Sequence, residues 1–188
     1  MVMKSFTYSI DSQDRLITAN SEWDAFALEN YAPELAFERI KYASLWDFIY
    51  DTETRHIYRL ILEKVRNSTV SVRLPFRCDS PDRRRFMEME MLPLEAMAVM
   101  FNTSIIREEK REPVKLLDAF TERSEQFIRM CSWCKCVILD DGSCMEVEEA
   151  VRRRELFNEP KLPRITHGAC AVCSKKWFDE IGSRRSSG

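Results

Sequence analysis

The C-terminal third of the chain carries two pairs of cysteines with the same spacing. Cys131 and Cys134 form one Cys-x-x-Cys pair, and Cys170 and Cys173 form the other. Two thiolates separated by two residues can face one ion from a tight turn, and two such pairs complete the tetrahedral four-sulfur shell of a structural zinc site. The spacing therefore predicts one structural Zn²⁺ ion held by these four cysteines.

Three other residues near the pairs bear on this prediction. His167, just before the second pair, is a rival fourth ligand, because three thiolates and one imidazole also form a good zinc shell. The two complete cysteine pairs favour the all-cysteine shell. Cys136 and Cys144 lie between the pairs, and we interpret them as small buried or half-buried thiols.

The same cysteines leave a second function open. A Cys-x-x-Cys pair can cycle between a dithiol and a disulfide, so oxidation of Cys131 with Cys134, or of Cys170 with Cys173, would release the metal and change the C-terminal region. A thiol-based redox sensor is therefore the alternative function. A covalent haem site is excluded, since such a site requires histidine at the position of Lys135.

Composition and charge restrict the partners. The chain of 188 residues is 45% hydrophobic and 32% charged, as is typical of a globular protein. Its net charge of -2 provides no positive field for nucleic acid or an anionic membrane. The arginine runs 83–85 and 152–154 have acidic neighbours, and we interpret them as solvated faces. The near-neutral net charge also disfavours a nucleic-acid-binding zinc module that uses Arg152–Arg154 and Arg164.

The N-terminal residues and the hydropathy pattern indicate where the protein works. The first residues lack the apolar stretch and cleavage site of a signal peptide. No segment approaches the roughly 18 apolar residues of a membrane-spanning helix. We therefore expect a cytoplasmic protein without membrane contact, and a reducing compartment favours metal binding over a disulfide framework.

The first hundred or so residues follow an α+β pattern. Alternating apolar side chains predict a hairpin over residues 6–17, and helical spacing predicts a helix after Asn20 or Ser21 and a longer one over Asp51–Arg66. Period-two alternation then predicts three strands, over Val70–Cys78, Arg85–Leu92 and Val99–Ile105. Arg73 and Arg77 would face solvent. These elements predict a five-stranded antiparallel sheet with helices on one face.

This order of elements resembles the PAS sensory fold, in which two strands, several helices and a three-stranded meander follow one another. Asp11–Asn20 resembles the first turn of that fold, with Asp14 where glycine is common, and Leu45–Ile49 resembles the segment before its long helix. The resemblance covers residues 4–108. It implies a sensory domain that binds a small ligand or a protein partner and often forms a homodimer. Residues 109–128 would then be a linker helix that carries the signal onward.

The C-terminal pattern is similar to a second bacterial sequence pattern. Met130–Lys135 together with Thr166–Cys173 resembles the Cys-Ser-x-Cys-Lys … His-Gly-x-Cys-x-x-Cys tail attached to PAS and receiver domains in bacterial signalling proteins. Ala171 replaces a proline often found there. We therefore expect a small zinc-stabilised α/β tail module over residues 129–181, with a turn at residues 140–142 and a helix over Met145–Phe157.

A PAS-like core often encloses a small-molecule pocket, although the same apolar side chains fill an ordinary core. The candidate lining residues are Trp23, Phe26, Trp46, Phe48, Met87, Met89, Val99 and Phe101. Haem is disfavoured because His56 is offset from the position of the iron ligand in haem-binding relatives, which falls nearer Tyr58. A flavin photosensor is disfavoured because Cys78, the first cysteine of the chain, lies on a predicted strand and not among the helices.

No catalytic pattern is present in the sequence. The chain has four glycines and two histidines and lacks a phosphate-binding loop, a glycine-rich nucleotide motif and a histidine-kinase core. We therefore expect a non-enzymatic regulatory protein with a PAS-like domain and a structural zinc site.

Overall fold

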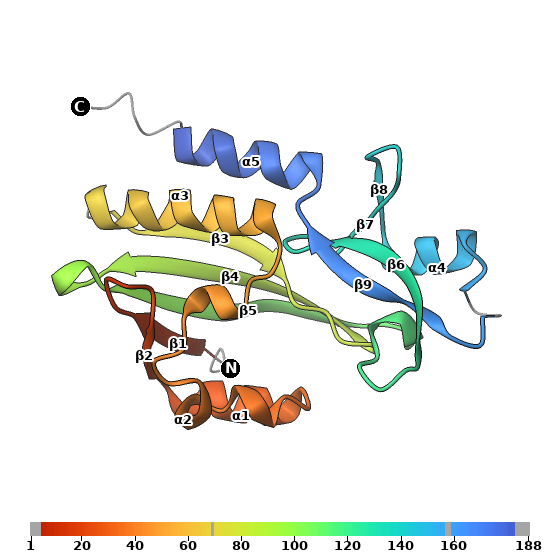
Figure 1. The fold of residues 1–188 in the computed structure, drawn as a ribbon, viewed down its shortest axis with the longest axis horizontal. Helices are drawn as coiled ribbons and strands as arrows, with labels where there is room; N and C mark the ends of the chain where they lie inside the picture. The colour runs from red at the N-terminus through yellow and green to blue at the C-terminus, as the bar shows by residue number, and fades with distance from the viewer. Residues whose placement is uncertain (1–4, 69, 157–158, 183–188) are drawn as a thin grey trace. The chain divides into compact units, whose positions relative to one another are not determined.

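The computed structural model describes residues 5–68, 70–156 and 159–182 (Figure 1). The chain divides into two compact units. The first contains the residues up to Tyr50, Tyr58–Phe76 and Phe86–Arg107, and the second contains Asp51–Ile57, Arg77–Arg85 and the chain from Glu108 onward. None of the described helices is long and apolar enough to cross a membrane.

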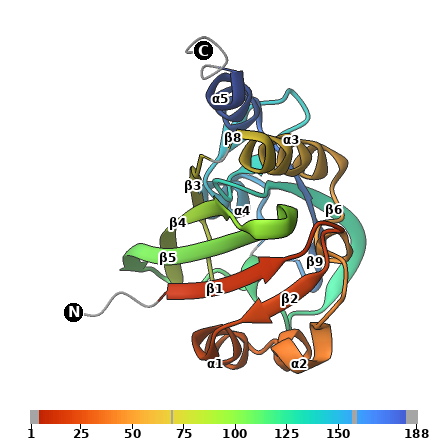
Figure 2. The ribbon, with the colours of Figure 1, turned by 90° about the vertical axis from the view of Figure 1, so that its left-hand side faces the viewer.

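A five-stranded antiparallel sheet has the strand order β2-β1-β5-β4-β3 (Figure 2). Its strands are β1 (Ser5–Ile10), β2 (Leu16–Ala19), β3 (Val72–Arg77), β4 (Arg83–Pro93) and β5 (Val99–Lys110). β1 pairs antiparallel with both β2 and β5, so that Tyr8 lies opposite Ala19 on one side and Phe101 on the other. The prediction of a five-stranded antiparallel sheet is confirmed.

The helices between β2 and β3 begin where the sequence provides capping groups. The Asn20 side chain accepts a hydrogen bond from the Trp23 N–H group at 3.2 Å, which confirms it as the N-cap of α1 (Ser21–Glu29). The Asp51 carboxylate accepts from the Thr54 N–H group at 2.6 Å at the start of α3 (Thr52–Ser68). Short helical segments lie between these two helices: η1 (Pro33–Leu35), α2 (Phe37–Ile40) and η2 (Leu45–Asp47).

The core of the first unit follows the predicted periodicities. On α3 the buried Ile61 and Val65 of this unit follow the buried Ile57, which belongs to the second unit, at helical spacing. On β4 the alternate residues Met87 and Met89 are buried with Met91, while the residues between them are half-buried. Both patterns therefore place their apolar faces in the core as predicted. Two short 3₁₀ segments, η3 (Glu95–Met97) and η4 (Lys115–Leu117), precede and follow β5.

The second unit contains a mixed four-stranded sheet of order β8-β7-β6-β9 (Figure 1). Its elements are β6 (Arg123–Cys131), β7 (Val137–Ile138), β8 (Cys144–Met145), α4 (Val147–Arg153), β9 (Leu162–Gly168) and α5 (Ala171–Gly182). β6 and β9 pair in parallel, with Cys131 opposite Gly168. A separate core that includes Leu116, Ile128 and Val147 lies within this unit.

The prediction of a linker helix over residues 109–128 is wrong. β5 continues to Lys110, η4 makes a single turn, and β6 begins at Arg123. The physical reason is tertiary: Val114 and Leu116 are buried in the second core, and the Arg123 guanidinium donates to the carbonyls of Leu116 and Asp118 at 3.0 and 2.7 Å. These contacts fix a turn where the local composition alone favoured a helix.

Arg77 is buried, which overturns its predicted place on the solvent face. Its guanidinium donates to Asp79 and, at 2.8 Å, to Glu146. Arg111 lies 3.2 Å from both Asp79 and Glu148. Each buried arginine thus has carboxylate partners within the second unit, as burial of a charge requires.

The arginine runs differ from one another in exposure. Arg84 contacts Glu148 at 2.7 Å, and the Arg85 side chain, which contacts Glu108 at 3.1 Å, is only 12% exposed. The interpretation of residues 83–85 as a solvated face is therefore wrong for Arg85. Arg152 and Arg153 are 66% exposed beside Glu149, as a solvated face would be.

Candidate metal centre

All seven cysteines of the chain belong to the second unit. Cys131 is the last residue of β6, Cys134 lies in the turn that follows, and Cys136 directly precedes β7. Cys170 and Cys173 lie at the start of α5, just after β9. Because β6 and β9 are parallel neighbours, their C-terminal ends bring the two Cys-x-x-Cys segments together.

Backbone hydrogen bonds shape the turn after β6. The Cys131 N–H group donates to the Cys136 carbonyl at 2.8 Å, and the Lys135 N–H group donates to the Cys131 carbonyl at 3.1 Å. Lys135 has a φ of 59°, which closes the turn in the left-handed region. The Ser132 N–H group donates to the Gly168 carbonyl at 2.8 Å and links this turn to the end of β9.

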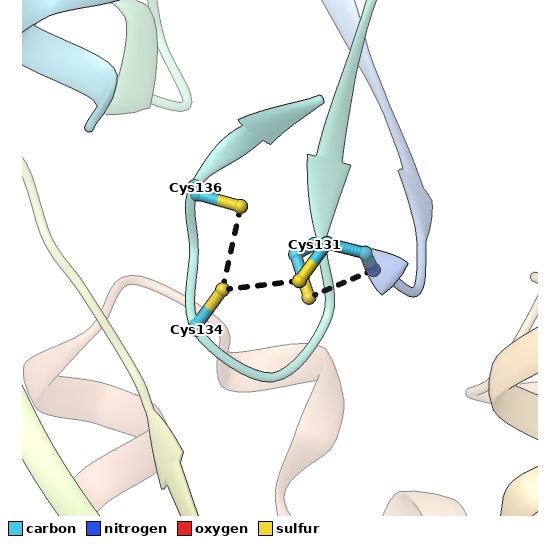
Figure 3. A group of neighbouring side chains, drawn as sticks. Cys131, Cys134 and Cys136 are labelled. Atoms are coloured by element: carbon cyan, nitrogen blue, oxygen red, sulfur yellow. Dashed lines mark hydrogen bonds between the residues drawn. The ribbon is translucent and has the colours of Figure 1, made fainter. Parts of the chain in front are cut away.

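The sulfur atoms of Cys131, Cys134, Cys136 and Cys170 all lie within 4.8 Å of one another. Figure 3 shows the sulfurs of Cys134 and Cys136 facing each other across the turn, 3.3 Å apart. The Cys134 and Cys170 sulfurs are 3.8 Å apart. Four sulfurs at about 2.3 Å from a tetrahedral zinc ion lie about 3.8 Å from one another. The residues therefore fit a metal ion such as zinc.

Cys173 lies beside this group. Its N–H group donates to the Cys170 sulfur at 3.4 Å, and the Cys170 N–H group donates to the Cys131 sulfur at 3.4 Å. Hydrogen bonds from the Cys134 and Cys173 side chains lower the pKa of Cys131. The hydrogen bond to Cys131 raises the pKa of Cys134 to about 11 and raises that of Cys173 as well. These donors stabilise a thiolate at Cys131, and a metal cation can take the place of their protons.

Cys136 and Cys144 form a disulfide across the β7–β8 hairpin. Their interpretation as unbonded thiols is therefore wrong for this structure. Cys136 is buried and Cys144 is exposed. A sulfur in a disulfide is not a thiolate ligand, so Cys136 belongs either to the disulfide or to the four-sulfur group.

His167 lies on β9 opposite Met130 of β6. Desolvation of the imidazole, together with the charge of Lys135, lowers the pKa of His167. In the part of the chain that the structure describes, the four cysteines are the only close group of metal-ligating side chains, and His167 is not among them.

The predicted ligands and the observed group overlap in three residues: Cys131, Cys134 and Cys170. Cys136 was missed, although the Cys134-Lys135-Cys136 spacing was a signal that a third sulfur leaves the same turn. The place of Cys173 in the shell stays a prediction.

Both cysteine segments are held by residues at the start of α3 that belong to the second unit. The Thr54 hydroxyl lies 3.0 Å from the Ser132 hydroxyl. The Glu53 carboxylate accepts from the Ala169 N–H group at 3.1 Å and from Arg129 at 2.7 Å. These side chains fix the backbone that carries the ligands, as outer-shell groups do in metal sites.

Two buried tryptophans lie on the segments that carry the cysteines. Trp133, between the first two cysteines, packs against Trp177 of α5 with ring centroids 5.0 Å apart. Both side chains are buried. The ring pair packs the turn after β6 against α5.

The first unit has a separate surface groove of about 230 Å³. It is lined by Asp14, Trp46, Arg59, Leu62, Glu63, Arg66, Asn67 and Met97. Of the predicted pocket residues, Trp46 lines this groove, and its indole N–H group donates to Asp14 at 2.9 Å. Met87, Met89, Val99 and Phe101 are buried.

The two residues considered for haem binding lie in different surroundings. The His56 ring lies 6.0 Å from that of Phe178 in the second unit. Tyr58 belongs to the first unit, where burial raises the pKa of its hydroxyl to about 12. Its hydroxyl lies 3.9 Å from the sulfur of Met89.

No protein-family profile matches the chain, and the search of curated proteins finds no match to it. The fold and the site by themselves define an α+β protein with a candidate cysteine metal centre.

Proposed function

We propose that this chain is a non-enzymatic regulatory protein in which a PAS-like domain is joined to a structural zinc site. The observation that carries the proposal is the convergence of Cys131, Cys134, Cys136 and Cys170. Four-thiolate shells are characteristic of structural zinc, because they leave no open position for a substrate. The role of the ion is to stabilise the fold of the second unit.

The PAS-like part of the proposal rests on the order of the elements. Two strands, a series of helices and three strands follow one another, and all five strands form one antiparallel sheet. Helices on one face of that sheet, homodimer formation and regulation of a protein partner belong to this proposal. The groove around Trp46 is its candidate site for a small ligand.

Helix α3 gives the zinc site a means of regulating the rest of the chain. Glu53 and Thr54 bind the two cysteine segments, and α3 continues as one helix to Ser68. A change at the cysteines would therefore alter the first turn of a helix that also contributes Ile61 and Val65 to the core of the first unit.

The test is the metal content of the purified reduced protein by mass spectrometry. We expect about one zinc per chain and no visible chromophore, as a closed four-thiolate zinc site requires. Cys170→Ser should lose the metal, whereas Cys78→Ser, which alters a cysteine of the same unit outside the group, should retain it. A folded protein with free thiols and no zinc would overturn the proposal.

The bond between Cys136 and Cys144 favours a second candidate, the thiol-based redox sensor. In such a sensor, oxidation within Cys131–Cys134 or Cys170–Cys173 would release the metal. Zinc release by mild peroxide, with recovery after a thiol reductant and fresh zinc, would support this candidate. Retention of zinc under the same treatment would contradict it.

A further inference from the structure

Five sulfurs gather around a site that needs four. Cys131, Cys134 and Cys170 are common to every four-sulfur set considered above. Cys136 joins them by distance, and Cys173 lies beside them, where its N–H group donates to the Cys170 sulfur at 3.4 Å. Since a closed zinc shell has four ligands, one of the last two sulfurs is always left over.

We propose that Cys136 and Cys144 are a reversible redox pair that selects the fourth metal ligand. In the reduced protein Cys136 is the fourth sulfur, and in the oxidised protein Cys136 is bonded to Cys144 and Cys173 takes its place. The inference rests on the proposed zinc site and adds its regulation. It differs from the redox sensor described above because the metal is retained throughout.

The β7–β8 hairpin brings Cys136 and Cys144 close together. The Leu139 N–H group donates to the Ser143 carbonyl at 2.9 Å, and Gly142 closes the turn with a φ of 79°. The hairpin register sets Ile138 opposite Cys144. The α-carbons of Cys136 and Cys144 are 5.8 Å apart, within the usual range for a disulfide.

Exposure separates the two cysteines of the pair. Cys144 is exposed and therefore accessible to an oxidant or a reductant, whereas Cys136 is buried beside the other sulfurs. Cys136 thus connects the surface of the hairpin to the metal site. Its carbonyl also accepts from the Cys131 N–H group, so a change in the Cys136 side chain acts on the turn that carries the ligands.

The chemistry balances with hydrogen peroxide as the oxidant. The Cys136 sulfur leaves the metal as a thiolate and bonds to the Cys144 sulfur, and the two sulfurs together lose two electrons. Cys144 and Cys173 each release a thiol proton. Peroxide accepts both electrons and both protons and becomes two water molecules, while the Cys173 thiolate completes the shell. A thiol reductant reverses the exchange.

The experiment uses the full chain loaded with zinc, before and after mild peroxide treatment. The readouts are zinc per chain, the number of thiols after denaturation in chelator, and peptide mapping of the disulfide. In the wild type we expect the thiols to fall from seven to five, with Cys136 bonded to Cys144 and zinc retained.

Two variants separate the roles of the exchanging ligands. Cys173→Ser should hold zinc when reduced and lose it on oxidation, because no fourth sulfur remains. Cys144→Ser should retain both its zinc and its reduced Cys136 under the same mild treatment. Cys78→Ser is the matched control and should behave as the wild type does.

Each possible failure has a distinct meaning. Zinc that stays bound in oxidised Cys173→Ser, or leaves the wild type as the Cys136–Cys144 bond forms, overturns the ligand exchange alone. A zinc-loaded protein in which that bond does not form also overturns only this inference. Failure of the reduced wild type to bind zinc overturns the proposed zinc site and the exchange with it.

Discussion

The hydroxyl groups of Thr54 and Ser132 lie 3.0 Å apart and join the first turn of α3 to the segment between Cys131 and Cys134. Thr54 is only 5% exposed, so water cannot readily replace this hydrogen bond. The bond ties helix α3 directly to the Ser132 side chain, within the turn that carries Cys131 and Cys134.

Thr54→Val is expected to destabilise the second unit by about 1 kcal/mol. Valine retains the shape of threonine but removes the hydroxyl, and a hydrogen bond of this kind contributes about 1 kcal/mol. The free energy of unfolding, measured by urea titration with tryptophan fluorescence, tests the prediction. Ser132→Ala should give a similar loss, and the double variant should lose less than the sum of the two.

Gly168→Ala is expected to destabilise the protein because an added methyl group would overlap Arg129. A β-carbon at this position would lie 2.8 Å from the Arg129 Cζ atom. The guanidinium would have to move away from Glu53, which it contacts at 2.7 Å. Because the guanidinium ends a flexible, half-exposed side chain that can swing aside, we expect a loss of no more than about 1 kcal/mol in thermal unfolding, the cost of the displaced ion pair.

Arg129→Ala provides the control for that prediction. Its ion pair with Glu53 is roughly half exposed, so the single substitution should cost less than about 1 kcal/mol. In the Arg129→Ala background, Gly168→Ala should become nearly neutral. If Gly168→Ala costs the same in both backgrounds, the overlap with Arg129 is not its cause.

Arg77→Met is expected to destabilise the second unit by about 3 kcal/mol, since it leaves a buried carboxylate with fewer partners. The Asp79 side chain is 1% exposed and would retain only the contact of 3.2 Å with Arg111 among its ion pairs. Chemical denaturation measures the loss. Adding Asp79→Asn should recover part of it by removing the buried charge.

Arg73→Met on the same strand is the matched comparison. Arg73 is 65% exposed and pairs with Glu90, and an exposed pair contributes less than about 1 kcal/mol. Equal losses for Arg73→Met and Arg77→Met would contradict the assignment of a buried charge network.

The sequence predicts those parts of the structure that depend on local patterns. Asn20 caps α1 through a side chain three residues from its donor, and the alternation of Met87, Met89 and Met91 marks a half-buried strand. Cys131 and Cys134 are recognisable for the same reason, because the spacing of two ligands within one turn is a local property.

The parts that were not predicted depend on contacts between distant residues. The burial of Arg77 requires Glu146, 69 positions away, and the linker segment becomes a turn and a strand because β6 pairs with β9. Cys136 joins the metal group only once the turn after β6 has its observed shape. No local periodicity encodes these relationships.

Acid is expected to weaken the contacts of Glu148 in the second unit. Burial raises the pKa of this carboxyl, but hydrogen bonds from its backbone and from Arg84, with the charges of Arg84 and Arg111, outweigh burial and lower the pKa below its ordinary value of 4.5. The unfolded chain therefore binds more protons than the folded chain as pH falls below that value. The stabilisation is complete above the unfolded pKa and is lost as pH falls through the folded pKa.

Urea unfolding between pH 7 and pH 3 measures this effect in the wild type and in Glu148→Gln. The variant should be less stable at pH 7 by no more than about 1 kcal/mol, and the difference between the two proteins should shrink as the pH falls. Loss of metal in acid affects both proteins alike, so the difference isolates Glu148. Glu125→Gln alters a carboxylate that is 87% exposed and should follow the wild type throughout. A difference that stays constant from pH 7 to pH 3 would assign the loss to packing and not to the carboxylate charge.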